Sequence, residues 1–171
     1  MAEPWCGRAW VFGSDIDTDQ IIQTGFLQMF LPDEELGKHA MTIVDPAFAE
    51  QVRPGDFMIV GDNFGCGSSR EEAVVALKAC GISGVLGSSF ARIFYRNAIH
   101  QGLRAWEVPG IHEEIQAGDR LCVWPSEGRV SVEDGSYEGA FTPLPAFLED
   151  IISVGGLIPY HQQRLQAKRS G

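Results

Sequence analysis

Positive charge and long apolar runs are both scarce in this sequence. Only 13 Lys and Arg stand against 23 Asp and Glu, which gives a net charge of −10. Nucleic acids and anionic membranes attract basic proteins, so this balance opposes both as partners. No apolar run approaches the ~20 residues of a membrane-spanning helix, and the first residues lack the basic stretch of a secretory signal. We therefore expect a cytoplasmic protein.

Cysteine and histidine are too few and too scattered to predict a metal site. Neither the spacing of a zinc finger nor the clustered spacing of an iron–sulfur protein occurs among the four cysteines, which are Cys6, Cys66, Cys80 and Cys122. We expect this chain to bind no cluster and all four thiols to be reduced, with Cys80 and Cys122 in the core. Three histidines also lack partners at metal or triad spacing: His39, His112 and His161. We expect them at the surface or at helix ends.

The remaining composition is that of a compact α/β protein. Its 171 residues are 44% hydrophobic, enough to bury one core, so we expect a single domain over residues 1–171. Apolar periodicity predicts strands at 7–12, 56–60, 84–86, 104–108, 120–124 and 129–132, helices at 73–80, 92–101 and 144–154, and broken helical material at 32–52. This order predicts a mixed α/β sheet with flanking helices and a β-rich layer.

The segment 61–73 is the most informative part of the chain. It joins a buried strand to a helix through closely spaced glycines and presents Ser68, Ser69 and Arg70 just before the helix. The first amides of a helix have no intrahelical partner and, with the helix dipole, favour a carboxylate or phosphate in front of them. Arg70 adds a planar fork suited to bidentate carboxylate binding. The segment therefore predicts an anion site whose glycines let the backbone approach a ligand.

Three other motifs can be compared with this segment. Ser68 with Glu71, and Ser69 with Glu72, satisfy the capping-box pattern. Capping explains one Ser and Glu pair, but not two serines beside Arg70. A P-loop requires Lys before the hydroxyl residue, and a dinucleotide fingerprint requires Gly or Ala where Arg70 stands. Because neither condition is met, the anion site is preferred.

Four segments together resemble one protein family. The segment 67–71 resembles the Gly-Ser-Ser-Arg-Glu motif of the swivelling domain of the aconitase superfamily. The whole chain is similar to the separate small subunit of 3-isopropylmalate dehydratase and of its homoaconitase relatives, with further matches at 13–22, 89–98 and 155–157. The resemblance implies a swivelling β/β/α fold. It also implies a hydro-lyase, active only with an iron–sulfur large subunit in a heterodimer or heterotetramer.

Alternating aspartates in the segment 15–19 suggest a calcium loop at first. A calcium loop needs Gly where Gln20 stands and Glu where Phe26 stands, so this interpretation fails. On spacing alone, the segment is a turn that leads into a helix capped by Thr18 or Asp19. The resemblance implies instead that both residues lie at the active-site cleft, where Asp19 orients a histidine of another chain.

The resemblance also implies a mechanism, the reversible dehydration of a 2-hydroxy dicarboxylic acid. A [4Fe-4S] cluster on the large subunit would act as a Lewis acid toward the leaving hydroxyl. Ser68 would be the base, and its alkoxide would need stabilisation by nearby amides and by Arg70. Ser69, Arg70 and Thr18 are the expected ligands of the substrate.

The family resemblance implies that the segment 26–29 selects the substrate. Relatives carry a Tyr-Leu-x-x loop there, and this chain has Phe26, Leu27, Gln28 and Met29. Relatives acting on an extra carboxylate carry Arg at the position of Gln28, and Gln cannot neutralise that charge. The apolar side chains favour a branched alkyl group, which indicates 3-isopropylmalate and leucine biosynthesis rather than homocitrate or citrate. Citramalate and dimethylmalate stay open, because apolar pockets discriminate by only about 1–3 kcal/mol per methylene. The alternative is that these side chains belong to the core.

The predicted helix at 92–101 has two expected roles. Its apolar face, with Ile93 and Phe94, should pack on the sheet. Arg96 and Asn97 are candidates to brace the anion loop.

Two functions of other classes remain open from the residues alone. A non-catalytic regulatory module would use the same anion site without a base. A hydrolase would use Ser68 as nucleophile, but it needs a histidine and an orienting acid in the folded site. Cys66 is a weaker candidate nucleophile, since helix amides could lower its pKa but no histidine adjoins it in the sequence.

Overall fold

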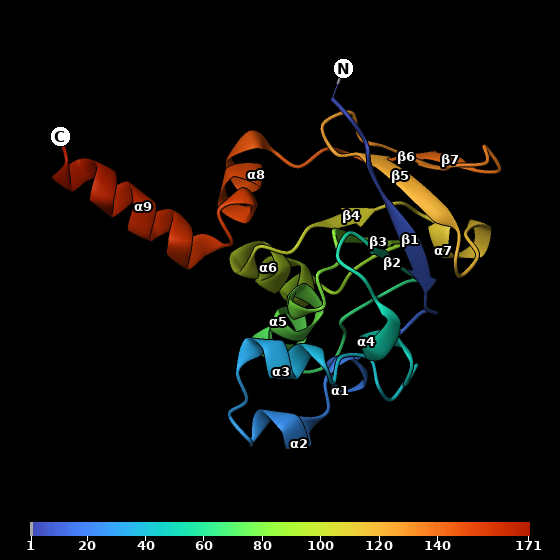
Figure 1. Ribbon diagram of the computed structural model, residues 1–171, viewed down its shortest axis with the longest axis horizontal. Coiled ribbons are helices and arrows are strands. Elements are labelled where there is room, and N and C mark those ends of the chain that lie inside the picture. The colour runs from blue at the N-terminus through green and yellow to red at the C-terminus, as the bar shows by residue number, and fades with distance from the viewer. Residues whose placement is uncertain (1) are drawn as a thin grey trace.

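The computed structural model describes residues 2–171. The strands are β1 (Trp5–Val11), β2 (Phe57–Val60), β3 (Gly84–Gly87), β4 (Ala105–Glu107), β5 (Arg120–Trp124), β6 (Arg129–Val132) and β7 (Glu138–Ala140). The helices are α1 (Thr18–Ile21), α2 (Thr24–Leu27), α3 (Asp33–Gly37), α4 (Phe48–Gln51), α5 (Glu71–Ala79), α6 (Arg92–Gln101), α7 (Ile111–Glu114), α8 (Ala146–Ser153) and α9 (Leu157–Arg169) (Figure 1).

All the strands belong to one mixed sheet with the order β4-β3-β2-β1-β5-β6-β7. β1 to β4 are parallel, while β5, β6 and β7 are antiparallel to their neighbours. The parallel half uses α5 and α6 as crossover helices, because a parallel connection must carry the chain back along the sheet. The predicted mixed sheet with flanking helices is confirmed. The helix expected after the turn at 15–19 is α1, whereas the short elements β7, α2 and α7, and the helix α9, were not predicted.

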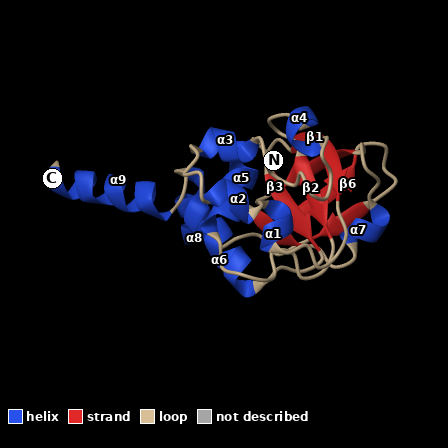
Figure 2. Cartoon of the chain, turned by 90° about the horizontal axis from the view of Figure 1, so that it is seen from below, coloured by secondary structure: helices blue, strands red, loops and turns tan. Residues whose placement is uncertain are grey.

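The sheet curls, and its two faces bury different cores. Along β2, Met58 packs in a cluster with the helices, while Phe57 packs in a second cluster with the antiparallel strands. The rings of Trp106 on β4 and Phe141 after β7 lie 5.3 Å apart between centroids, so the two edges of the sheet approach each other. Figure 2 shows most helices gathered beside the strands. The result is a layer of helices on a doubled layer of strands.

Helix α6 confirms one part of its predicted packing and corrects another. Phe94 is 2% exposed and belongs to the helix-side core, as expected. Ile93 is 49% exposed, so the expectation that it packs on the sheet was wrong. Adjacent residues lie about 100° apart around a helix, so both cannot face the sheet.

Helix α9 extends away from the rest of the molecule (Figures 1 and 2). None of its residues is buried, and Ile158 and Leu165 are largely exposed. Neither this helix nor any other within residues 2–171 is long and apolar enough to cross a membrane.

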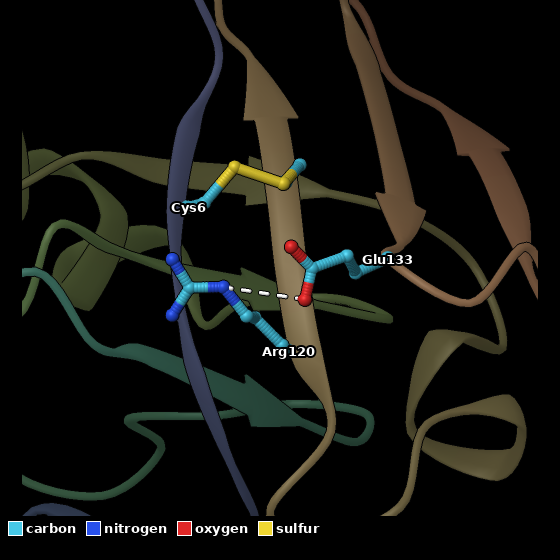
Figure 3. The surroundings of a disulfide bond; sticks show 4 residues. Cys6, Arg120 and Glu133 are labelled. Carbon is cyan, nitrogen blue, oxygen red and sulfur yellow. Dashed lines mark ion pairs between the residues drawn. A yellow bond between two sulfur atoms is a disulfide. The ribbon is translucent and has the colours of Figure 1, made fainter.

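The expectation that all four cysteines are reduced is wrong for two of them. Cys6 on β1 and Cys122 on β5 form a disulfide, shown in Figure 3. The antiparallel register places them directly opposite each other, with their Cα atoms 4.1 Å apart. Arg120 and Glu133 form an ion pair of 3.4 Å beside this bond. The two cysteines are 116 residues apart in the sequence, so only the pairing of β1 with β5 reveals the bond.

Reduction of this disulfide should destabilise the fold. A cross-link that closes so long a loop restricts the unfolded chain, so we expect reductant to lower the free energy of unfolding by about 2–4 kcal/mol. Denaturant unfolding with and without dithiothreitol measures this. The Cys6→Ser variant is the control, because its stability should not respond to the reductant. Detection of four free thiols in the denatured, unreduced protein would contradict the bond.

Candidate active site

The candidate site lies where the parallel strands β1, β2 and β3 end. Beyond β1, the segment 13–18 runs beside the loop 61–66 that follows β2, and backbone hydrogen bonds join them. The amides of Asp15, Gly65 and Thr18 donate to the carbonyls of Asp62, Ile16 and Cys66, respectively, over 2.8, 2.8 and 3.0 Å. The pairing of β1 with β2 thus continues past the strand ends. It fixes the loop that carries Ser68 and Arg70 beside the start of α1.

Two glycines allow the loop 61–66 to pack closely, Gly61 against segment 13–18 and Gly65 against α6. A Cβ at Gly61 would stand 2.3 Å from Oγ of Ser14, and a Cβ at Gly65 would stand 2.2 Å from the ring of Phe94. Gly65 also has a positive φ of 82°, which disfavours other residues. We expected the glycines to bring the backbone close to a ligand, but Gly61 and Gly65 have a different role. At these two positions they bring the loop close to the protein itself.

The capping-box interpretation of the serines is wrong. Arg70, with φ −133° and ψ 110°, occupies the N-cap of α5, and no side chain accepts a cap hydrogen bond there. Both Ser68 and Ser69 lie before the cap and are exposed. Their hydroxyls form no hydrogen bond within residues 2–171. They are therefore free to meet a ligand.

Arg70 is held by the segment that follows β1. Its Nη1 donates to Oδ1 of Asp19 in an ion pair and to Oγ1 of Thr24 over 2.9 Å. Thr24 in turn donates to the same Oδ1 over 3.1 Å. The Arg70 side chain is 19% exposed and that of Asp19 is 58% exposed. The structure thus brings two predicted site residues together, and Thr24 is a third partner that sequence reasoning missed.

Thr18 is buried and braces the loop from below. It is 3% exposed, and its hydroxyl donates to the carbonyl of Ser68 over 3.0 Å. This contact links Thr18 to the position of the predicted base.

The N-cap of α1 is Asp17, so the expected cap at Thr18 or Asp19 was wrong. The Asp17 carboxylate accepts from the amide of Gln20, and Oε1 of Gln20 accepts from the amide of Asp17, each over 2.9 Å. This is a reciprocal capping box, and the Asp-x-x-Gln spacing in the sequence could have revealed it. Asp19 is consequently released from capping and can pair with Arg70.

The segment 26–29 divides into a packed half and an exposed half. Phe26 stacks on His39 with ring centroids 3.8 Å apart, and Phe26 and Leu27 pack against the helix-side core. Gln28 is exposed, and Met29 is 62% exposed. The core alternative therefore holds in part for the first two side chains. The last two are available to a ligand or another chain.

The two free cysteines are poorly suited to be nucleophiles. Burial, together with the negative charges of Asp17 and Asp15, raises the pKa of Cys66 above its usual range. The expectation that helix amides lower this pKa was therefore wrong. Burial raises the pKa of Cys80 to about 12. A thiolate is needed for attack, so neither side chain is activated near neutral pH.

The other predicted supports of the site are placed elsewhere. Neither Arg96 nor Asn97 hydrogen-bonds to the loop 61–70 within the described chain. Phe94, packed under Gly65, fills that role instead. No histidine of residues 2–171 hydrogen-bonds to Ser68, so a hydrolytic triad is not assembled. Within the same residues, no group of three or more His, Cys, Asp or Glu side chains could hold a metal ion.

The arrangement can bind and orient a carboxylate. Arg70 supplies a cation, and α5 begins at Glu71 with amides that lack intrahelical partners. Two exposed carboxylates, Glu71 and Glu72, lie in this first turn. Their negative charges partly offset the attraction of the helix dipole for another anion. Gln101 donates to Oε2 of Glu71 over 3.2 Å and holds that carboxylate toward α6. Arg70 is therefore the main attraction for an anion beside Ser68.

Comparison with known proteins gives one consistent family. The family model described as the aconitase C-terminal domain matches residues 28–109. The 3-isopropylmalate dehydratase small subunit 1 of Methanopyrus kandleri is 52% identical over 152 residues, 89% of each chain. The isopropylmalate/citramalate isomerase small subunit of Methanocaldococcus jannaschii is 43% identical over 93% of this chain and 94% of its own.

This chain belongs to the 3-isopropylmalate dehydratase small-subunit family. A crystal structure of 3-isopropylmalate dehydratase (leuD) from Methanocaldococcus jannaschii matches with a TM-score of 0.90 and 38% identity, covering 98% of this chain and 99% of that chain. The expected swivelling-domain fold is thereby confirmed. The matched residues 28–109 include the serines, Arg70 and α6, while the Thr18 and Asp19 segment lies outside them.

Proposed function

We propose that this chain is the small subunit of a heteromeric hydro-lyase that interconverts 3-isopropylmalate and 2-isopropylmalate in leucine biosynthesis. The observation that carries the proposal is the exposed Ser68 on a loop whose Arg70 is paired with Asp19. Family membership supplies the class of reaction, and the site supplies a base and a carboxylate-binding cation. The complex with a large subunit would work in the cytoplasm as a heterodimer or heterotetramer.

The side chains of this subunit divide the work on the substrate. Ser68 removes the proton next to a carboxylate, and nearby amides and Arg70 stabilise its alkoxide. Ser69 and Arg70 bind and orient the carboxylate end of the substrate, and Thr18, the third expected ligand, has a supporting role. Thr18 acts through its contact with the Ser68 carbonyl, since its own hydroxyl is buried. Asp19, exposed beside them, orients a histidine supplied by the large subunit.

The residues of this chain do not fit an iron–sulfur cluster. A cluster needs several thiolates, and the described cysteines comprise one disulfide and two separate thiols, Cys66 and Cys80. We place the [4Fe-4S] cluster on the large subunit, where it would supply Lewis-acid assistance to departure of the hydroxyl. The surface that carries Ser68, Arg70 and Asp19 would then face the large subunit.

Gln28 and Met29 are the side chains through which this subunit would select its substrate. Both are exposed, whereas Phe26 and Leu27 are half-buried and shape the loop from behind. An uncharged Gln28 leaves a third carboxylate unpaired, which disfavours homocitrate and citrate. The relative named for both isopropylmalate and citramalate is consistent with weak discrimination among alkyl groups.

Titration of the cognate iron–sulfur large subunit with this chain tests the proposed function. We expect isopropylmalate isomerisation to rise and saturate at stoichiometric addition, because each partner contributes one wall of the site. This chain alone should be inactive. Stoichiometric binding without any turnover would favour the non-catalytic regulatory module, and ester hydrolysis by the isolated chain would favour the hydrolase.

The Ser68→Ala variant tests the proposed base. Loss of a catalytic base should lower kcat of the reconstituted complex by at least about 100-fold while assembly is unchanged. Steady-state kinetics and co-elution with the large subunit measure the two effects. Ser126→Ala, in the exposed turn between β5 and β6, is the matched control and should keep full activity. Normal turnover by Ser68→Ala would exclude Ser68 as the base.

The Gln28→Arg variant tests substrate selection. The new charge can pair with a third carboxylate, so the ratio of kcat/KM for isopropylmalate to that for homoaconitate should fall. Competition assays on the reconstituted complex measure this ratio. Gln162→Arg on α9 adds the same charge at an exposed place and should leave the ratio unchanged. If the ratio of kcat/KM does not change in Gln28→Arg, the segment 26–29 does not select the substrate.

A further inference from the structure

Thr24 occupies the centre of the contacts that hold Arg70. Its hydroxyl accepts from Nη1 of Arg70 over 2.9 Å and donates to Oδ1 of Asp19 over 3.1 Å. Arg70 and Asp19 are themselves paired through the same two atoms. The three side chains thus close a triangle of hydrogen bonds. A hydroxyl suits its third corner because it can accept from a cation and donate to an anion at once.

We propose that Thr24 is a positioning residue, which fixes Arg70 and Asp19 in the orientations needed for substrate. This inference rests on the proposed function of the chain. Thr24 touches neither the reacting atoms nor, in this proposal, the substrate. It acts through the two charged side chains on either side of it.

The geometry at Arg70 shows what is fixed. Both contacts use Nη1, and within residues 2–171 no hydrogen bond engages Nε or Nη2. A guanidinium has five donors in a rigid plane, so anchoring one corner sets the direction of the others. The edge formed by Nε and Nη2 is the one left to bind a carboxylate through two parallel hydrogen bonds. Thr24 therefore limits rotation of the fork while leaving its binding edge open.

The geometry at Asp19 is complementary. Arg70 and Thr24 both donate to Oδ1, and no donor of the described chain reaches Oδ2. The second oxygen remains available to accept from an imidazole N–H of a partner chain. Anchoring of Oδ1 fixes the direction in which Oδ2 points.

The place of Thr24 in the chain links this triangle to substrate selection. Thr24 is the first residue of α2, and this helix leads directly into Gln28 and Met29. It is exposed, so its hydroxyl is not needed to satisfy a buried group. Removal of that hydroxyl should change the alignment of Arg70 with little effect on stability.

Kinetics of Thr24→Val in the reconstituted complex test the proposal. Val keeps the shape of Thr and removes the hydroxyl, so we expect KM for isopropylmalate to rise about fivefold to twentyfold, with a smaller change in kcat. Thr24→Ser restores the hydroxyl and should return KM to within about twofold of the parent value. Thr142→Val, at an exposed threonine after β7, is the matched control and should leave KM unchanged.

A double variant separates positioning from general disturbance. If Thr24 acts through Arg70, Thr24→Val should add little to KM in an Arg70→Lys background, because the fork to be positioned is already lost. An unchanged KM in Thr24→Val, failure of Thr24→Ser to rescue, or fully multiplicative effects in the double variant would each overturn the proposal. Absence of isomerase activity in the parent complex would count against the proposed function instead.

Discussion

The pairing of segment 13–18 with loop 61–66 is the constraint on which the candidate site depends. Parallel strands place their carboxyl ends at one edge, and here the hydrogen bonds between β1 and β2 continue into the loops that follow them. That continuation requires glycine at Gly61, where the backbones meet, and Gly65 lets the same loop pack on the ring of Phe94. The pairing carries two residues far apart in sequence, Asp19 and Arg70, into contact. This backbone pairing places the loop that carries Ser68 and Arg70 beside α1, and side-chain contacts then orient Arg70.

The candidate site contains a positive charge although the chain as a whole is strongly negative. The protein has a net charge of −10, and the first turn of α5 adds two carboxylates. Arg70 is the cation that offsets this field beside Ser68, and Asp19 both neutralises and anchors it. Because Nη1 of Arg70 is already paired with Asp19, the guanidinium can bind one further carboxylate group but not several.

The two cores lie on opposite faces of the sheet, and the candidate site lies on the helix side. The curled antiparallel strands bury one core and are joined to β1 by the Cys6 and Cys122 disulfide. The helices cover the other core, and Thr18, Asp19 and Arg70 lie at the N-terminal ends of α1 and α5. Met29 and Phe30 beside them are exposed, at 62% and 91%. An apolar exposed patch of this kind next to a charged site is expected where another subunit completes it.

Sequence alone determined the order of most strands and helices and the family, because periodicity and short motifs are local properties. Tertiary structure decided the rest. The disulfide depends on the register of strands whose cysteines lie 116 residues apart, and the role of Thr24 depends on a contact with Arg70 across 46 residues. The cap of α1 was encoded in the Asp17 and Gln20 spacing, but Ser68 and Ser69 satisfied the same kind of pattern without capping. A local pattern states which hydrogen bonds a side chain could form, and only the folded backbone determines which of them are within reach.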